Sequence, residues 1–337
     1  HILLIHYMIG FKEWRIIMSK ILVTRNMPEK FIDQLREGHE VIVWEEFDKA
    51  IPRETLLEQS KDVDAMMTMM SDQIDSEVLE NAGNLKVVAN FAVGYDNFDL
   101  DAFKQYDVIG TNTPDVLTET TAELGFSIMM SLARRIVEAD HFMKNGEWTG
   151  WSPFLMSGTD IFNKTVGIYG MGSIGTAFAR RLQGFNCNVL YHNRSRNEAA
   201  EQLTGAKYCE FDELVQSSDI VVCTAPLNDG TKDKFNKETF DKMKESALFV
   251  NIGRGGHVVE EDLLEAIQSE SIKGAALDVF REEPMKTDHP FLKEDRIVTT
   301  PHIGSATVDT RDKMIQLCVD NILNVLDGKD PITPINK

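Results

Sequence analysis

The sequence predicts an α/β protein with two doubly wound parallel sheets. Two series of short, β-branched apolar segments alternate with segments of helical periodicity, and this alternation is typical of right-handed βαβ units around a parallel sheet. The chain has 337 residues, which exceeds the usual size of one domain, so each series can form a domain with its own core.

The first series extends from residue 20 to about 112 and predicts one parallel sheet. Its strand candidates are ILVTR, EVIVW, DAMMTMM, LKVVANFAVG and VIGTN. Helical patterns lie between them, for example PEKFIDQLREG and SEVLENAG. We predict a flavodoxin-like order of strands for this domain.

A long helix is expected between the two series. It begins near Thr118 or Glu119 and ends at Gly146, because TETTAELGFSIMMSLARRIVEADHFMKNG carries apolar residues at helical spacing. The second series then supplies six strand candidates, KTVGIYG, CNVLYHN, DIVVCTAP, SALFVNIG, IKGAALDVF and RIVTTPHIG. Six such units predict a complete Rossmann-type domain.

The last helical pattern, SATVDTRDKMIQLCVDNILNVLDG, has no second sheet of its own to join, so we expect it to pack back on the first domain. The first domain is then discontinuous and comprises 18–117 with 304–337. The second domain comprises 118–303.

Residues 1–17 are interpreted as an N-terminal extension, and Met18 as the natural start. MSKILVTR passes from a polar start straight into a strand-like segment, whereas the residues before it share no pattern with the rest of the chain. A genuine N-terminal helix is the alternative, because short apolar runs are ambiguous by periodicity. No targeting signal is evident in this segment.

The charge balance excludes some classes of partner. The formal net charge of -19 repels nucleic acid and anionic lipid, so neither nucleic acid nor membrane is an expected partner. A site for an anionic substrate must therefore carry its own cation. The four cysteines form no CxxC pair and show no metal-ligand spacing, which predicts no metal site and a reduced, cytoplasmic setting.

A glycine-rich loop predicts a dinucleotide site. Gly170, Gly172 and Gly175 form GMGSIG between the strand TVGIY and a helical pattern. The first glycine permits the tight turn, the second lets the backbone approach a pyrophosphate, and the third allows close helix packing. We include Ser173 and Ile174 of the same loop among the cofactor-binding residues, because the pyrophosphate would rest on the helix N-terminus.

The residues after the next strand favour a phosphorylated ribose. HNRSR supplies Asn193, Arg194, Ser195 and Arg196, and no Asp or Glu that would hold the ribose hydroxyls of NAD. We therefore expect NADP as the preferred cofactor, with NAD possible. The alternative is that both arginines are solvated surface charges.

Three polar residues follow strands of the second series and form the candidate catalytic group. Arg254 lies in NIGRGG, Glu283 in LDVFREEP and His302 in TPHIGSAT. Taken singly, each has a structural explanation, such as a surface ion pair or a solvated turn. Because the carboxyl ends of such strands converge on one crevice, we expect the three to share one site.

These motifs together resemble the D-2-hydroxyacid dehydrogenase family, in particular its glyoxylate and hydroxypyruvate reductase branch. The resemblance is nearly full length and rests on NFAVGYDNFDL, NTPDVLTETTAELGFSIMMSLARR, GEWTGW, TVGIYGMGSIG, NIGRGG, ALDVFREEP and TPHIGSAT. It implies a hydride transfer from NAD(P)H to a small 2-oxo acid, which gives the D-2-hydroxy acid where C2 is chiral. It also implies a homodimer with the linking helices at the interface.

The resemblance assigns roles within the candidate catalytic group. It implies that Arg254 holds the substrate carboxylate, that His302 is the acid/base, and that Glu283 pairs with His302. Asp278 would lie near the nicotinamide. We also count Pro226, at the end of DIVVCTAP, among the cofactor-binding residues.

The substrate side is expected on the first domain. The resemblance implies that the backbone of Ala92, Val93 and Gly94 helps bind the carboxylate. Met70 is a candidate for the wall of a small apolar pocket, although a methionine there can equally be a core residue. TMMSDQID and NFAVGYDN contain no Lys or Arg, so a phosphorylated substrate is disfavoured.

Two other activities are compatible with this fold. Formate dehydrogenases place Gln rather than Glu beside the histidine, so Glu283 argues against formate oxidation. Dinucleotide-sensing corepressors retain the same catalytic residues, and the motifs alone do not exclude such a binding protein.

Overall fold

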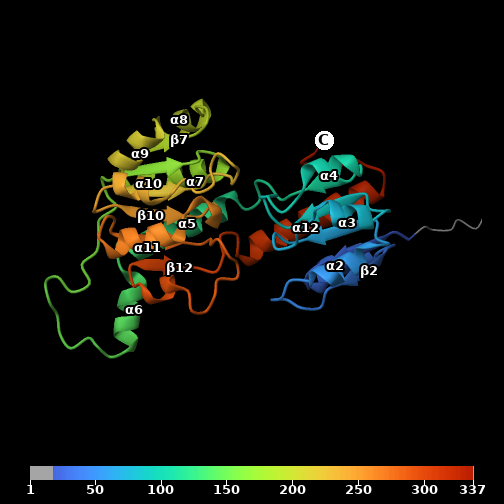
Figure 1. The fold of residues 1–337 in the computed structure, drawn as a ribbon, viewed down its shortest axis with the longest axis horizontal. Coiled ribbons are helices and arrows are strands. Elements are labelled where there is room, and N and C mark those ends of the chain that lie inside the picture. The colour runs from blue at the N-terminus through green and yellow to red at the C-terminus, as the bar shows by residue number, and fades with distance from the viewer. Residues whose placement is uncertain (1–17, 337) are drawn as a thin grey trace, which may run out of the picture. The chain divides into compact units, whose positions relative to one another are not determined.

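The computed structural model describes residues 18–336 and divides the chain into two compact units. The first contains the chain up to Thr113 together with Ile315–Lys337, and the second is Pro114–Met314. The chain thus passes from one unit to the other at 113–114 and at 314–315, whereas the boundaries were expected at 117–118 and 303–304. The expectations for residues 1–17 lie outside the described residues. Each unit is built around one parallel sheet (Figure 1).

The sheet of the first unit has the flavodoxin-like order β2-β1-β3-β4-β5, with every pairing parallel. Its strands are β1 (Lys20–Val23), β2 (Glu40–Val43), β3 (Ala65–Thr68), β4 (Val87–Asn90) and β5 (Ile109–Thr111). Every residue of β3 and β4 is buried, as expected for central strands with helices on both faces. The helices are α1 (Glu29–Arg36), α2 (Arg53–Ser60), α3 (Ser76–Asn81) and α4 (Leu100–Gln105).

The last helix, α12 (Val308–Leu326), crosses from the second unit into the first. Within the first unit, the amide of Gln316 donates to Gln34 on α1 over 2.8 Å. The tail after this helix adds a bridge to β5, where the Ile335 N–H donates to the Gly110 carbonyl over 2.9 Å. These bonds fix the C-terminal segment to the first sheet.

The second unit contains seven parallel strands in the order β12-β11-β10-β9-β6-β7-β8. They are β6 (Thr165–Tyr169), β7 (Asn188–His192), β8 (Lys207–Tyr208), β9 (Ile220–Cys223), β10 (Leu248–Asn251), β11 (Gly274–Leu277) and β12 (Ile297–Thr299). The predicted fold, two doubly wound parallel sheets with one of Rossmann type, is confirmed. The two-residue strand β8 was not expected.

Helices and short 3-10 turns connect these strands. The α-helices are α7 (Ser173–Leu182), α8 (Glu198–Thr204), α9 (Phe211–Ser217), α10 (Lys237–Lys242) and α11 (Glu260–Gln268). The 3-10 turns span Gln183–Phe185, Gly255–His257 and Pro290–Lys293. Phe178 of α7 and Leu214 of α9 are completely buried, so both helices contribute to the cores beside this sheet.

The prediction of a single long helix from Thr118 to Gly146 is wrong, because the helix is interrupted near Arg135. The structure has two helices, α5 (Thr118–Ala133) and α6 (Ile136–Lys144), separated at Arg135, which adopts the left-handed conformation with φ 53°. The Ala133 carbonyl accepts from the Thr159 N–H over 2.7 Å, so it is taken by a neighbouring loop. The Arg135 guanidinium donates to Glu138 in the first turn of α6 over 2.7 Å, which stabilises the new helix start.

Helix α6 and the segment after it are exposed. No residue of α6 is buried. Trp151 and Phe154 in the following loop are each 83% exposed. Figure 1 shows this loop making a wide excursion from the sheet of its own unit. Residues 18–336 include no helix that is both long and apolar enough to cross a membrane.

The cysteines are all free thiols. Cys209, Cys223 and Cys318 are buried, and Cys187 is half-buried. Burial raises the pKa of Cys209 to about 11 and that of Cys223 to about 12.

Candidate active site

The candidate site lies at the carboxyl edge of the second sheet. The chain order reverses between β6 and β9, and in such sheets ligands bind outside the carboxyl ends of the strands at this switch point. The glycine loop follows β6, Pro226 follows β9, and Arg254 follows β10. The topology therefore brings the predicted residues of this unit to one edge.

Each glycine of the loop has a distinct steric role. Gly170 has φ +106°, and a side chain there would bring its Cβ to 2.4 Å from the Ala225 nitrogen. A Cβ at Gly175 would lie 2.3 Å from the Gly170 carbonyl oxygen, so only glycine lets α7 approach its strand this closely. Gly172, by contrast, faces open space with nothing within 4 Å. An anion can approach the N-terminus of α7 there.

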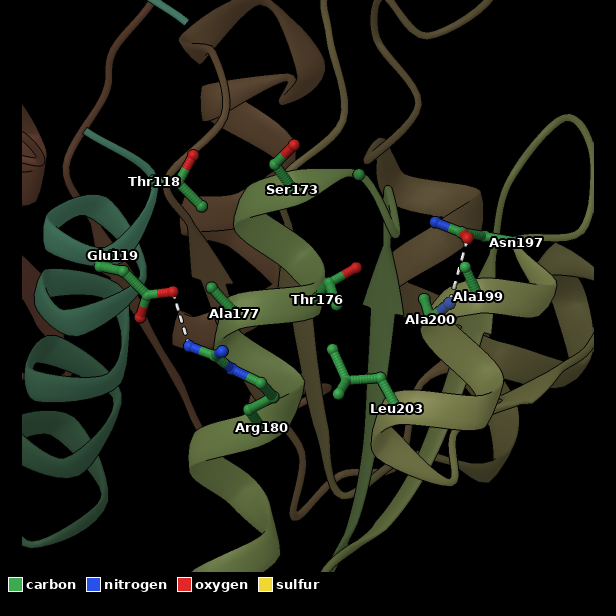
Figure 2. A pocket seen from close by; sticks show the side chains of 11 residues that line it. Thr118, Glu119, Ser173, Thr176, Ala177, Arg180, Asn197, Ala199, Ala200 and Leu203 are labelled. Carbon is green, nitrogen blue, oxygen red and sulfur yellow. Dashed lines mark hydrogen bonds and ion pairs between the residues drawn. The ribbon is translucent and has the colours of Figure 1, made fainter. Parts of the chain in front are cut away.

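Ser173 and Ile174 begin helix α7, and a hollow of about 460 Å³ lies along its exposed side (Figure 2). Figure 2 shows the hydroxyl of Ser173 at the helix start and Leu203 entering from α8. Arg180 is the only cation in the lining, and its guanidinium is paired with Glu119 over 2.6 Å. The Ser173 hydroxyl is therefore a polar group of this lining that directly follows the glycine Gly172 at the start of α7.

Two asparagines fasten the loop after β7 to the glycine loop. The Asn193 Oδ1 accepts from the Met171 N–H over 2.6 Å, and the Asn197 Nδ2 donates to the Met171 carbonyl over 2.8 Å. Asn193 is therefore held by the backbone between the first two glycines. Asn197 was not predicted, although an asparagine before a helical pattern is an N-cap signal, and its Oδ1 does accept from Ala200 N–H.

The two arginines of this loop differ in their contacts. Both are exposed, as is Ser195. Arg196 forms a bidentate ion pair with Glu201, in which Nη2 lies 2.6 Å from Oε2 and Nε lies 3.0 Å from Oε1. Tyr191 donates its hydroxyl to the same carboxylate over 2.6 Å. These bonds, above all the one from Arg196, lower the pKa of Glu201 to about 2. Arg194 has no ion pair or hydrogen bond within residues 18–336.

His302 and Glu283 form the short contact of the site. The His302 Nδ1 lies 2.6 Å from the Glu283 Oε2, and the other Glu283 oxygen accepts from the Phe280 N–H over 2.9 Å. Burial alone would raise the pKa of Glu283, but the hydrogen bond and charge of His302 outweigh it and hold that pKa below its usual range. Arg254 contributes to the same lowering through its charge, so all three predicted residues interact.

Asp278 organises the loop that carries His302. It is 2% exposed and accepts from the Thr300 hydroxyl over 2.7 Å and from the N–H groups of Ile303 and Gly304, each over 2.8 Å. Burial raises the pKa of Asp278. Both of its oxygens are thus engaged with the segment around His302, a role that the sequence did not indicate.

A buried histidine connects the Arg254 turn to Pro226. The side chain of Arg254 donates from Nη1 to the Gly253 carbonyl over 2.9 Å. The His257 Nδ1 accepts from the Arg254 N–H over 3.2 Å, and its Nε2 lies 3.3 Å from the Pro226 carbonyl oxygen. His257 is completely buried and was not predicted, because a lone histidine in a loop has no distinctive spacing.

The predicted substrate backbone lies in the first unit, after β4. The Ala92 N–H donates to the Asn90 carbonyl over 2.8 Å, and the Gly94 carbonyl accepts from the Asn90 Nδ2 over 2.9 Å. The Val93 carbonyl accepts from the Asn112 Nδ2 over 2.7 Å. In the part of the chain that the structure describes, the N–H groups of Val93 and Gly94 have no hydrogen-bond partner. Two adjacent unpaired N–H groups are suited to an anion.

Met70 is half-buried and lies in a loop braced by buried polar residues. Asp72 accepts from the Met69 N–H over 2.8 Å and from the Thr24 hydroxyl. Burial raises the pKa of Asp72. Asn97 donates from Nδ2 to the carbonyls of Met69 and Asp72 over 3.1 and 2.9 Å. These bracing residues link segments far apart in sequence, so spacing alone could not identify them.

No group of three or more His, Cys, Asp or Glu in residues 18–336 is arranged to hold a metal ion. The polar side chains at the edge of the second sheet are a histidine–carboxylate pair and an arginine. Such a set can bind a carboxylate and transfer a proton.

Comparisons with known proteins agree with this chemistry. Residues 126–304 match the family model described as D-isomer specific 2-hydroxyacid dehydrogenase, NAD binding domain. A glyoxylate reductase of Pyrococcus furiosus is 44% identical over 94% of this chain and 95% of its own length. A glyoxylate reductase of Thermococcus kodakarensis is 43% identical over 94% of this chain and 96% of its own.

Solved structures share the fold over the same length. A protein of Thermus thermophilus superposes with a TM-score of 0.88 at 37% identity, covering 94% of this chain and 99% of that one. The NADPH-dependent glyoxylate/hydroxypyruvate reductase of Sinorhizobium meliloti, solved with NADP and malonate, gives 0.83 at 29% identity, covering 94% and 96%. The chain therefore belongs to the D-isomer specific 2-hydroxyacid dehydrogenase family.

Proposed function

We propose that this protein reduces small 2-oxo acids, of the glyoxylate or hydroxypyruvate type, with a nicotinamide dinucleotide, and that NADPH is the preferred one. The 2.6 Å contact between His302 and Glu283, beside Arg254 at the switch-point edge, carries the proposal. The glyoxylate reductases that share 43–44% of its sequence support the choice of substrate. None of the relatives described above is named as a corepressor, so the binding-protein alternative has no support.

The residues of the second unit fit a dinucleotide. The open space at Gly172, in front of the first turn of α7, suits a pyrophosphate, and the unpaired Arg194 suits a ribose 2′-phosphate. Ser195 and Pro226 would contact the same ligand. When bound, NAD(P)H supplies the hydride that reaches the carbonyl carbon of the substrate.

Residues of the second unit neutralise the negative charge that the hydride transfer creates on the substrate. Negative charge develops on the carbonyl oxygen, and His302 donates a proton to it from Nε2, since its Nδ1 faces Glu283. The Glu283 carboxylate stabilises the imidazolium before the transfer. Arg254 holds the substrate carboxylate with its planar fork, which supplies two parallel donors to the two carboxylate oxygens.

The cytoplasm is the proposed compartment, because all four cysteines are free thiols.

A substrate and cofactor panel tests the activity. Glyoxylate, hydroxypyruvate, pyruvate and bulkier 2-oxo acids are each assayed with NADPH and with NADH by the loss of absorbance of the reduced nicotinamide. We expect the highest kcat/KM with glyoxylate or hydroxypyruvate, and roughly tenfold to a hundredfold higher efficiency with NADPH, the worth of one charge-assisted contact. No turnover of any 2-oxo acid would contradict the proposed reductase, and equal use of both cofactors would contradict the preference.

Substitutions of the histidine pair test the proton donor. His302→Ala should lower kcat by roughly 10²-fold to 10⁴-fold, because no other group replaces the donor. Glu283→Gln removes the carboxylate that favours the imidazolium, so its reduction rate should fall at a lower pH than that of the wild type. The pH–rate profiles measure this, with cofactor binding as the check on folding. An unchanged profile for Glu283→Gln would argue against the pair.

Arg254→Lys tests carboxylate recognition. A lysine keeps the charge but loses the two parallel donors, so kcat/KM for glyoxylate should fall by about tenfold or more. Cofactor affinity should stay unchanged and serves as the control. If kcat/KM matched the wild type, Arg254 would have only a structural role.

We propose a homodimer because helix α6 and the loop that follows it in the chain are exposed. Large apolar side chains are exposed along α6 and this loop, Trp151 and Phe154 most of all, and such a concentration of exposed apolar side chains indicates an interaction surface. The family resemblance makes a second copy of this chain the expected partner. Trp151→Ser with Phe154→Ser should convert a dimer into a folded monomer in analytical ultracentrifugation. A monomeric wild type, or an unaffected double variant, would contradict this interface.

A further inference from the structure

We propose that Glu201 tunes the cofactor preference by neutralising Arg196, so that Arg194 is the cation that recognises the 2′-phosphate. This inference rests on the proposed function, which takes NADPH as the preferred cofactor. It gives different roles to Arg194 and Arg196, which the sequence alone does not distinguish. It also gives a specificity-determining role to Glu201, which lies outside the HNRSR segment.

The contact between Arg196 and Glu201 has the geometry of a strong ion pair. Two nitrogens of one guanidinium meet both oxygens of one carboxylate, at 2.6 and 3.0 Å. Such bidentate pairs are directional as well as charge-assisted. The Glu201 side chain is only 18% exposed, whereas Arg196 is 60% exposed. The carboxylate is thus the fixed partner, and the arginine lies over it.

Tyr191 keeps Glu201 in place. The completely buried Tyr191 donates its hydroxyl to Glu201 over 2.6 Å and accepts from the Asn197 N–H over 2.8 Å. If Glu201 moved with Arg196 toward a phosphate, it would break the bond from a buried hydroxyl. A phosphate must therefore compete with Glu201 for Arg196.

Arg194 has no such competitor. It is exposed and has no ion pair or hydrogen bond in the described part of the chain. Its neighbour Asn193 is fastened to Met171 in the glycine loop, which holds the Arg194 backbone beside the predicted pyrophosphate site. A phosphate that binds here orders the Arg194 side chain but does not have to displace an existing ion pair.

The experiment measures binding without turnover, using adenosine 2′,5′-bisphosphate and 5′-AMP as probes in calorimetry. The two probes differ only in the 2′-phosphate. Arg194→Ala should weaken the bisphosphate by roughly tenfold to a hundredfold and leave 5′-AMP unchanged. The double variant Arg196→Ala with Glu201→Gln removes the ion pair as a unit, and its bisphosphate affinity should stay within about threefold of the wild type.

Releasing Arg196 tests the role of Glu201 directly. Glu201→Gln keeps an acceptor for Tyr191 but loses the negative charge, so bisphosphate affinity should rise by about threefold to tenfold. Adding Arg196→Ala should remove that gain. Glu198→Gln is the matched control, because Glu198 is an exposed carboxylate on the same helix and has no ion pair in the described residues. It makes the same change in net charge, and because Glu198 acts on Arg196 only through its charge, without a direct contact, its gain in affinity should be clearly smaller than that of Glu201→Gln.

Three results would overturn the inference. The first is a loss in the Arg196→Ala, Glu201→Gln double variant as large as in Arg194→Ala. The second is an equal gain in Glu198→Gln and Glu201→Gln, which would indicate a general charge effect. The third is a wild type that binds both probes equally. Because no turnover is measured, failure to reduce any 2-oxo acid would contradict the proposed function alone.

Discussion

The chemistry at the edge of the second sheet depends on the buried carboxylate of Asp278. A buried carboxylate is costly unless it is fully hydrogen-bonded, and Asp278 accepts three bonds, two of them from the backbone directly after His302. His302 itself has φ 51°, a conformation that a non-glycine residue rarely adopts without external support. The Asp278 bonds supply that support and present the imidazole to Glu283.

The same device recurs in both units. Short polar side chains, rather than regular secondary structure, tie the functional loops together. Asn193 and Asn197 fasten one loop of the second unit to Met171, and Asn97 fastens the loop of Met70 in the first. Each is locked by backbone partners, so the loops have the fixed geometry that binding and catalysis require.

The sequence is sufficient to predict features that repeat along the chain and residues that the parallel topology brings to one edge of a sheet. Strand and helix alternation predicts both sheets, and parallel topology explains why Arg254, Glu283 and His302 interact although they are far apart along the chain. The sequence could not predict features that depend on a single tertiary contact. The break at Arg135 falls within unbroken helical periodicity, and it follows from a carbonyl captured by Thr159. The pairing of Arg196 with Glu201 is a choice between side-chain rotamers, which spacing does not encode.

The buried cysteines have a consequence for how the protein meets reactive chemicals. Thiolates, not thiols, attack peroxides, disulfides and alkylating reagents. Cys223 and Cys209, with pKa values near 12 and 11, remain almost entirely protonated at neutral pH, and burial raises the pKa of Cys187 and Cys318 as well. Cys209, Cys223 and Cys318 should therefore react slowly with electrophiles and mild oxidants, and the half-buried Cys187 is the native thiol that such reagents should modify first.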